Sequence, residues 1–372
     1  MRVVIAPDKF KGSLDAARVA AALAAGLHDV IPAAECTIVP MADGGDGTVA
    51  AFLAAGASPR TLTVSGPLGE PVTATYAREG DTAIVEMASA SGLALLGPPL
   101  EPRRATTRGT GELLRDALDG GARRIVLGIG GSATTDGGAG ALSALGARFL
   151  DANGRQLEPA PEALAALARV DLTGLDPRLG QVDLAVACDV DNPLLGAQGA
   201  AAVYGPQKGT SAADAAFLDG VLARLADAMT AATARDLRSL PGAGAAGGLG
   251  WALASACGAR LERGVTLVAQ VRGLAEQLGG ADWCFTGEGR IDAQTLHGKV
   301  VEGVAALARA ANVDTIAFGG SVDPAAENAL RERGVHCVPI LTGPSTLEDA
   351  MRDTAPNLRA AAARIAPFLI RR

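Results

Sequence analysis

Residues 124–142 constrain the fold more than any other stretch of the chain. Residues 124–127, Arg-Ile-Val-Leu, form a short apolar run typical of a buried strand. The thirteen residues from 128 to 140 then include six glycines, and the sequence predicts a helix that begins near Ala139. A strand, a loop and a helix in this order are typical of an α/β domain.

The glycine-rich loop itself predicts a phosphate site. Glycines take positive φ easily and carry no side chain that would keep a ligand away from the backbone. Bared amides beside a helix start bind anions, most often phosphate, whereas a plain turn needs only one or two glycines. The residues expected to contact nucleotide or phosphate are Gly128, Gly130, Gly131, Ser132, Thr134, Thr135 and, from a second glycine-rich loop at 241–250, Gly244.

Two known loop types compete for the same residues. Gly128-x-Gly130-x-x-Ala133 fits a relaxed dinucleotide-binding fingerprint, with Asp151 at a suitable distance downstream. Against this, Asp136-Gly137-Gly138 interrupts the helix that should follow at once. The loop also loosely resembles the phosphate loop of small-metabolite kinases of the galactokinase type. Taken alone, it indicates phosphate binding and leaves the reaction open.

Composition narrows the class of protein. The chain has 372 residues, of which 49% are hydrophobic, so we expect two domains with a large core. No apolar run approaches the ~18 residues of a membrane helix, and the N-terminus is expected to form a strand rather than a signal peptide. The net charge of −7 argues against a nucleic acid partner. Five scattered cysteines predict reduced thiols and a cytoplasmic location.

The two ends of the chain share one pattern, and the middle has another. Strands followed by helices are predicted at the front and at the back, and together they would form one five-stranded parallel sheet. Ser13 is the expected N-cap of the first helix, and one long helix is expected over 347–365. The strands expected in this sheet are 3–6, 37–40, 283–285, 313–318 and 335–339.

Residues 61–64, 72–76 and 82–86 alternate between apolar and polar side chains instead, which predicts antiparallel strands. The predicted fold is therefore a Rossmann-like α/β domain of residues 1–62 and 281–372. A second α/β domain with a mixed sheet, residues 63–280, is inserted into it.

Polar clusters follow the predicted strand ends, where open α/β sheets bind ligands. Lys9 and Lys11 place two ammonium groups near a helix start, which suits a polyphosphate or a carboxylate. Asp43 and Asp46, in a glycine-rich loop, are the expected ligands of Mg²⁺, although they could equally cap the next helix. Asp189, at the mouth of a buried strand, is the expected general base, and Glu288 is its chief competitor.

The remaining candidates complete a set of charged and hydrogen-bonding groups. The three histidines allow no Ser-His-Asp or Cys-His arrangement. Glycine amides, hydroxyls, lysines and paired carboxylates are the groups that phosphoryl transfer with Mg²⁺ requires. We expect the catalytic residues to be Asp189, Lys9, Lys11 and Lys208, and the substrate-binding residues to be Asp8, Asn192, Glu288 and Arg290.

Four motifs, in order, resemble the bacterial glycerate kinases of the glyoxylate and sugar-diacid pathways. They are residues 6–14, 41–48, 128–138 and 286–292. The resemblance implies ATP- and Mg²⁺-dependent phosphorylation of D-glycerate, with 2-phosphoglycerate as the expected product and 3-phosphoglycerate as the alternative. It also implies a Rossmann-like domain with an inserted α/β domain, but it assigns no base.

Two other classes stay open, an NAD-dependent dehydrogenase and a non-catalytic nucleotide sensor. We expect no nucleic acid or membrane partner and allow for a homodimer.

Overall fold

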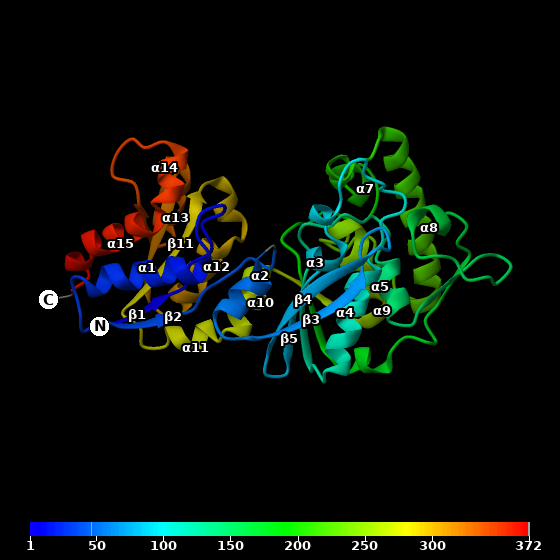
Figure 1. Ribbon diagram of the computed structural model, residues 1–372, viewed down its shortest axis with the longest axis horizontal. Coiled ribbons are helices and arrows are strands. Elements are labelled where there is room, and N and C mark those ends of the chain that lie inside the picture. The colour runs from blue at the N-terminus through cyan, green and yellow to red at the C-terminus, as the bar shows by residue number, and fades with distance from the viewer. Residues whose placement is uncertain (46, 371–372) are drawn as a thin grey trace. The chain divides into compact units, whose positions relative to one another are not determined.

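The computed structural model describes residues 1–45 and 47–370, and its contacts divide the chain into two compact units (Figure 1). The domain boundaries predicted at 62/63 and 280/281 stay a prediction, because compactness does not test independent folding. Residues 265–280 belong to the first of these units. Unit 1 comprises Met1–Asp43, Ala50–Gly56 and Val265–Arg372, and unit 2 comprises Gly44–Val49 and Ala57–Gly264.

Unit 1 contains the parallel sheet predicted from the two ends of the chain. Its strand order is β13-β12-β11-β1-β2, and all neighbours are parallel. β1 is central, with Val4 opposite both Cys284 and Thr37. The strands are β1 (Arg2–Ile5), β2 (Glu35–Ile38), β11 (Trp283–Ile291), β12 (Asp314–Val322) and β13 (Val335–Pro339).

Helices on this sheet bury an apolar core that includes Ile5, Leu23 and Phe285. α1 and α15 approach closely, because a Cβ on Gly26 would lie 2.1 Å from the Arg359 carbonyl oxygen. The helices of this unit are α1 (Ala16–His28), α2 (Thr48–Ala54), α10 (Gly264–Val271), α11 (Leu274–Leu278), α12 (Val300–Ala310), α13 (Pro324–Glu332), α14 (Leu347–Arg352) and α15 (Thr354–Ile365), of which α2 and α10 begin in unit 2.

Three local expectations for unit 1 were wrong. The N-cap of α1 is Asp15, whose side chain accepts from the Arg18 amide, and not Ser13. The helix expected over 347–365 is two helices (Figure 1), because Pro356 has no N–H to donate to Arg352 and its ring would clash there. The polar residues after Phe285 continue β11 instead of forming a loop, since they pair with β12 as far as Ile291.

Unit 2 contains a mixed sheet with the order β10-β9-β6-β5-β4-β3. The three strands expected to be antiparallel are confirmed, and β5, β6, β9 and β10 continue the sheet in parallel. The strands are β3 (Ser58–Ser65), β4 (Pro71–Glu79), β5 (Thr82–Glu86), β6 (Arg124–Gly128), β9 (Asp183–Ala187) and β10 (Arg260–Glu262).

Helices and a small two-stranded sheet surround this mixed sheet, over a core that includes Leu127, Leu225 and Trp251. A helix does begin at Ala139, as predicted. Among the described residues, no helix has the length and apolar character needed to span a membrane. The elements are α3 (Ala88–Ser91), α4 (Arg108–Asp119), α5 (Ala139–Ala144), β7 (Arg148–Leu150), α6 (Pro161–Leu164), β8 (Arg169–Asp171), α7 (Ala200–Tyr204), α8 (Ala212–Thr233) and α9 (Leu249–Cys257).

Candidate functional site

The strand order of unit 1 reverses between β1 and β11. From β1 the chain proceeds to β2 on one side, and from β11 it proceeds through β12 to β13 on the other. Open α/β sheets bind ligands at such a switch point, beyond the carboxyl ends of the strands. The Asp8 amide donates to the Gly287 carbonyl oxygen over 2.9 Å, which places Asp8 beside Glu288. The first and last sequence motifs therefore meet at this point.

Glu288 has a fixed orientation at the switch point. It is 5% exposed, and its Oε1 accepts a hydrogen bond of 2.5 Å from the Thr295 hydroxyl. Its Oε2 lies 3.9 Å from Nζ of Lys299. Burial raises the pKa of Glu288, and the Thr295 and Lys299 contacts oppose that shift. The result is a shielded carboxyl group whose two oxygens have separate partners.

Asp8 and Asp43 add two carboxylates to the same region. Burial raises the pKa of Asp8 to about 7, and the charges of Asp43 and Glu288 push it in the same direction. The Lys9 amide donates to Oδ1 of Asp8 over 2.7 Å and opposes the shift. Such mutual repulsion favours a bound cation or a proton. Asp46, the other predicted metal ligand, lies outside the described residues.

The cationic side chains of this region differ in exposure. Arg290 is 75% exposed at its side chain and lies 3.1 Å from a carboxylate oxygen of Asp292. Lys11 is exposed, and Lys9 is half-buried. These side chains can contact an anionic ligand without any rearrangement of the buried core of unit 1. The structure thus brings five of the predicted residues to one part of unit 1: Asp8, Lys9, Lys11, Asp43 and Glu288, with Arg290 two residues beyond Glu288 on β11.

In unit 2 the predicted phosphate loop is exposed only in part. Gly130 and Gly131 are exposed, and none of the backbone hydrogen bonds of the described loops uses their amides as donors. The Leu93 amide donates to the Gly131 carbonyl oxygen over 2.8 Å, and the Ala133 amide donates to Ser91, so the loop has a fixed backbone. Free amides on a fixed backbone suit an anion.

The other predicted members of this loop lie in the interior. Thr134 and Thr135 are buried, and Ser132 is nearly so. A Cβ on Gly128 would lie 2.2 Å from the Gly44 carbonyl oxygen, and one on Gly244 would lie 2.2 Å from that of Pro193. Both of these glycines are therefore required by close packing of the backbone.

Asp136 organises the loop, and the sequence reasoning assigned it no role. It is fully buried and accepts from the Thr107 amide at 2.7 Å, the Thr107 hydroxyl at 2.8 Å, and the Gly138 and Gly140 amides, each at 3.1 Å. These bonds fix the start of α5. A carboxylate just before a predicted helix was the available signal, since such residues often cap helices.

Lys208 also lies inside unit 2. Lys208 is 2% exposed, and its Nζ donates to the Thr134 carbonyl oxygen over 2.6 Å. Burial lowers its pKa to about 7, while the charge of Asp136 opposes the shift. The Lys208 side chain therefore holds the predicted phosphate loop from within.

Asn192 and Asp189 each have a local structural partner. Oδ1 of Asn192 accepts from the Tyr204 hydroxyl over 2.6 Å, and its Nδ2 donates to the Gln198 carbonyl oxygen over 2.9 Å. Asp189 is exposed and accepts from the Gly264 amide over 3.1 Å, at the first residue of α10. An exposed carboxylate can cap this helix and still reach a ligand.

Comparison with known proteins identifies the family. The model of the glycerate kinase family matches residues 3–370. The chain belongs to the glycerate kinase family. The glycerate kinase of Bacillus subtilis is 46% identical, covering 98% of this chain and 97% of that protein. The glycerate 2-kinase of Escherichia coli is 44% identical, covering 99% and 98%.

The fold of this chain is similar to that of a crystal structure from Salmonella typhimurium LT2, which is assigned to glycerate kinase 2. Its TM-score is 0.89 at 44% identity, and the match covers 99% of this chain and 98% of that chain. A member of the glycerate kinase family is an enzyme that uses ATP, so the kinase interpretation holds over the dehydrogenase and sensor alternatives. Asp151, the ribose ligand of the dehydrogenase alternative, closes a local turn with the Asn153 and Arg155 amides. The roles of individual residues stay predictions.

Proposed function

We propose that this enzyme transfers the γ-phosphoryl group of ATP to D-glycerate and releases 2-phosphoglycerate. Membership of the glycerate kinase family supports the substrate, and the name of the Escherichia coli relative supports the 2-phosphate. The observation that carries the proposal is the position of Asp8 beside Glu288 at the switch point, with Lys9 and Lys11 on the same loop. 3-Phosphoglycerate is the alternative product.

The residues of unit 1 suit a small hydroxy acid. Lys11 and Arg290 are exposed cations that can pair with its carboxylate. Asp8 and Glu288 can accept hydrogen bonds from its hydroxyl groups. Asp189 stays the proposed base, and Asp8 is its competitor, because a pKa near 7 suits a group that takes up a proton at neutral pH.

The carboxylates of unit 1 also fit Mg²⁺, because it prefers oxygen ligands and would offset the repulsion between Asp43, Asp8 and Glu288. Among the described residues, no three acidic, histidine or cysteine side chains form a metal cage. Mg²⁺ is commonly bound by one or two protein carboxylates together with substrate phosphates. A single carboxylate from the protein is therefore enough for such a site. We propose Asp43 as that ligand. The bound ion would neutralise charge on the transferring phosphoryl group.

We further propose that the amides of Gly130 and Gly131, with the Ser132 hydroxyl, bind a phosphate group of the nucleotide. The exposure of Gly130 and Gly131 and the fixed backbone of the loop support this role. Thr134, Thr135 and Gly128 would act through the shape of this loop, and Gly244 would act through the shape of the second glycine-rich loop. A cytoplasmic location and a homodimer remain expectations.

The test is to incubate the purified enzyme with ATP, Mg²⁺ and D-glycerate and to resolve the products by phosphorus NMR. We expect ADP and 2-phosphoglycerate in equal amounts. No ADP formation at millimolar D-glycerate would contradict the proposed activity. Formation of 3-phosphoglycerate alone would contradict only the choice of hydroxyl group.

A further inference from the structure

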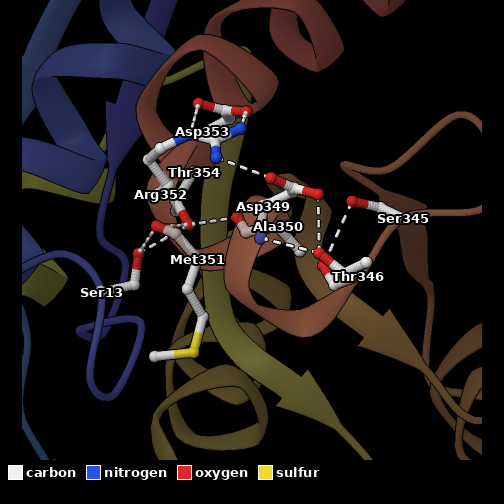
Figure 2. Close-up of polar contacts among 9 residues, drawn as sticks. All are labelled: Ser13, Ser345, Thr346, Asp349, Ala350, Met351, Arg352, Asp353 and Thr354. Carbon is white, nitrogen blue, oxygen red and sulfur yellow. Dashed lines mark hydrogen bonds and ion pairs between the residues drawn. The ribbon is translucent and has the colours of Figure 1, made fainter.

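Ser13 has a partner far away in the sequence. Its Oγ lies 2.6 Å from the Met351 carbonyl oxygen and 2.6 Å from Oγ1 of Thr354, as Figure 2 shows. Met351 lies near the end of α14, and Thr354 is the first residue of α15. The loop that carries Lys9 and Lys11 is thereby attached to the junction between two C-terminal helices.

The loop from residue 7 to residue 14 is itself a compact turn. The Phe10 amide donates to the Leu14 carbonyl oxygen over 2.8 Å, and the Ser13 amide donates to that of Phe10 over 2.9 Å. The Phe10 ring is buried in the core of unit 1. Gly12 has a φ of +77°, and a Cβ there would lie 2.9 Å from Cε of Met351. Ser13 therefore forms a polar link between this turn and the helices.

The junction that holds Ser13 is well fixed. Thr354 is buried, and its Oγ1 lies 2.9 Å from the Ala350 carbonyl oxygen. Arg352 pairs with carboxylates on both sides, at 2.6 Å from Asp349 and 2.7 Å from Asp353 (Figure 2). α15 is in turn packed on α1 through Gly26. We expect a loop that is hydrogen-bonded to this junction to be held in one position.

The Ser13 hydroxyl is not needed to start α1, because Asp15 caps that helix. Its removal should leave the helix intact and loosen the loop. We propose that Ser13 and Thr354 are positioning residues that hold the Lys9–Lys11 segment for an anionic group of a substrate. This inference rests on the proposed function of the two lysines. Neither Ser13 nor Thr354 is expected to touch the substrate.

The test compares kcat and KM for D-glycerate and for ATP in variants that keep or remove one hydroxyl. Ser13→Ala and Thr354→Val should each raise the KM for one substrate by roughly 2- to 10-fold, the range of one net hydrogen bond. The substrate whose KM rises shows whether a carboxylate or a phosphate is held. Ser13→Thr and Thr354→Ser, which keep the hydroxyl, should restore most of the loss.

Two further comparisons separate positioning from general stability. The double variant Ser13→Ala/Thr354→Val should have the kinetics of Ser13→Ala alone, because Ser13→Ala already removes the Ser13–Thr354 contact that Thr354→Val would remove. Ser13→Ala should have little further effect in a Lys11→Ala background. Ser345→Ala is the matched control, since this exposed hydroxyl donates to the Thr346 carbonyl oxygen in the same region and should change neither KM (Figure 2).

Unchanged kinetics in both Ser13→Ala and Thr354→Val, with Lys11→Ala impaired, would overturn the positioning role alone. An equal loss from Ser13→Ala with and without Lys11 would also overturn it, because the effect would not pass through the lysine. A wild-type enzyme inactive on D-glycerate would instead contradict the proposed function. Thermal unfolding midpoints should show that all variants are folded.

Discussion

Nζ of Lys208 lies 2.6 Å from the carbonyl oxygen of Thr134, in the interior of unit 2. The same loop is held from another direction by Asp136, which accepts from Thr107 and from the amides at the start of α5. Two buried polar side chains thus fix the backbone on either side of Thr135. The exposed glycines that precede this segment can then present their amides in one arrangement.

Replacing Lys208 should change how stability depends on pH. Burial lowers the pKa of Lys208 from 10.5 to about 7, so between these pH values the unfolded chain binds more protons than the folded one. The stability of the wild type relative to Lys208→Met should therefore rise with pH across this window, by at most about 1.4 kcal/mol per pH unit. Below pH 7 the difference should be constant.

Urea unfolding of both proteins at several pH values measures this difference. Lys11→Met is the control, because it removes an exposed ammonium group of the same kind. If the difference in unfolding free energy between wild type and Lys208→Met does not change with pH, burial does not lower the pKa of Lys208.

Gly131→Ala should weaken ATP binding. The added Cβ would lie 3.3 Å from Cβ of Ala88 and next to the exposed amides. Gly131 also has a φ of +71°, where a side chain costs roughly 1–2 kcal/mol. Gly154→Ala is the matched control, because it has a φ of +77° and open space around it. We expect the KM for ATP to rise several-fold in Gly131→Ala only. An equal KM for ATP in Gly131→Ala and the wild type would show that the loop has a structural role and does not bind ATP.

Asp189→Asn separates a general base from a helix cap. The amide oxygen of asparagine can still accept from the Gly264 amide, so the start of α10 should be preserved. Loss of a base should lower kcat by roughly 10²- to 10⁴-fold with ATP binding retained. Asp191→Asn, at an exposed position nearby, is the control. A changed Mg²⁺ requirement would indicate a metal ligand, and near-normal turnover would leave Asp8 as the candidate.

Glu288→Gln should raise the KM for D-glycerate by roughly 10- to 100-fold, the range of a hydrogen bond to a charged group. Thr295→Val should have a smaller effect in the same direction, because the Thr295 hydroxyl orients Glu288 through a contact of 2.5 Å. Thr295→Ser keeps the donor and should be close to wild type. Steady-state kinetics with D-glycerate as the varied substrate measure the KM of each variant. An unchanged KM in Glu288→Gln would show that Glu288 does not bind D-glycerate.

Several features followed from the sequence because their causes are local. Apolar runs followed by helices at both ends predicted one parallel sheet, and β1, β2, β11, β12 and β13 confirm it. Alternating side chains in residues 61–86 predicted the antiparallel strands of unit 2. The glycine-rich run after β6 marked a loop that leads into a helix at Ala139. Four motifs in order carried the resemblance to the family.

Tertiary structure alone decided which polar groups face solvent and which partners they find. Lys9 and Lys208 are both lysines near a predicted helix start, yet Lys208 is buried because other segments of unit 2 close over it. Ser13 looked like an N-cap, but its partner is Met351, separated from it by 338 positions. The physical reason is that short-range patterns specify strands, helices and turns, whereas the environment of a side chain depends on the packing of segments far apart in the sequence.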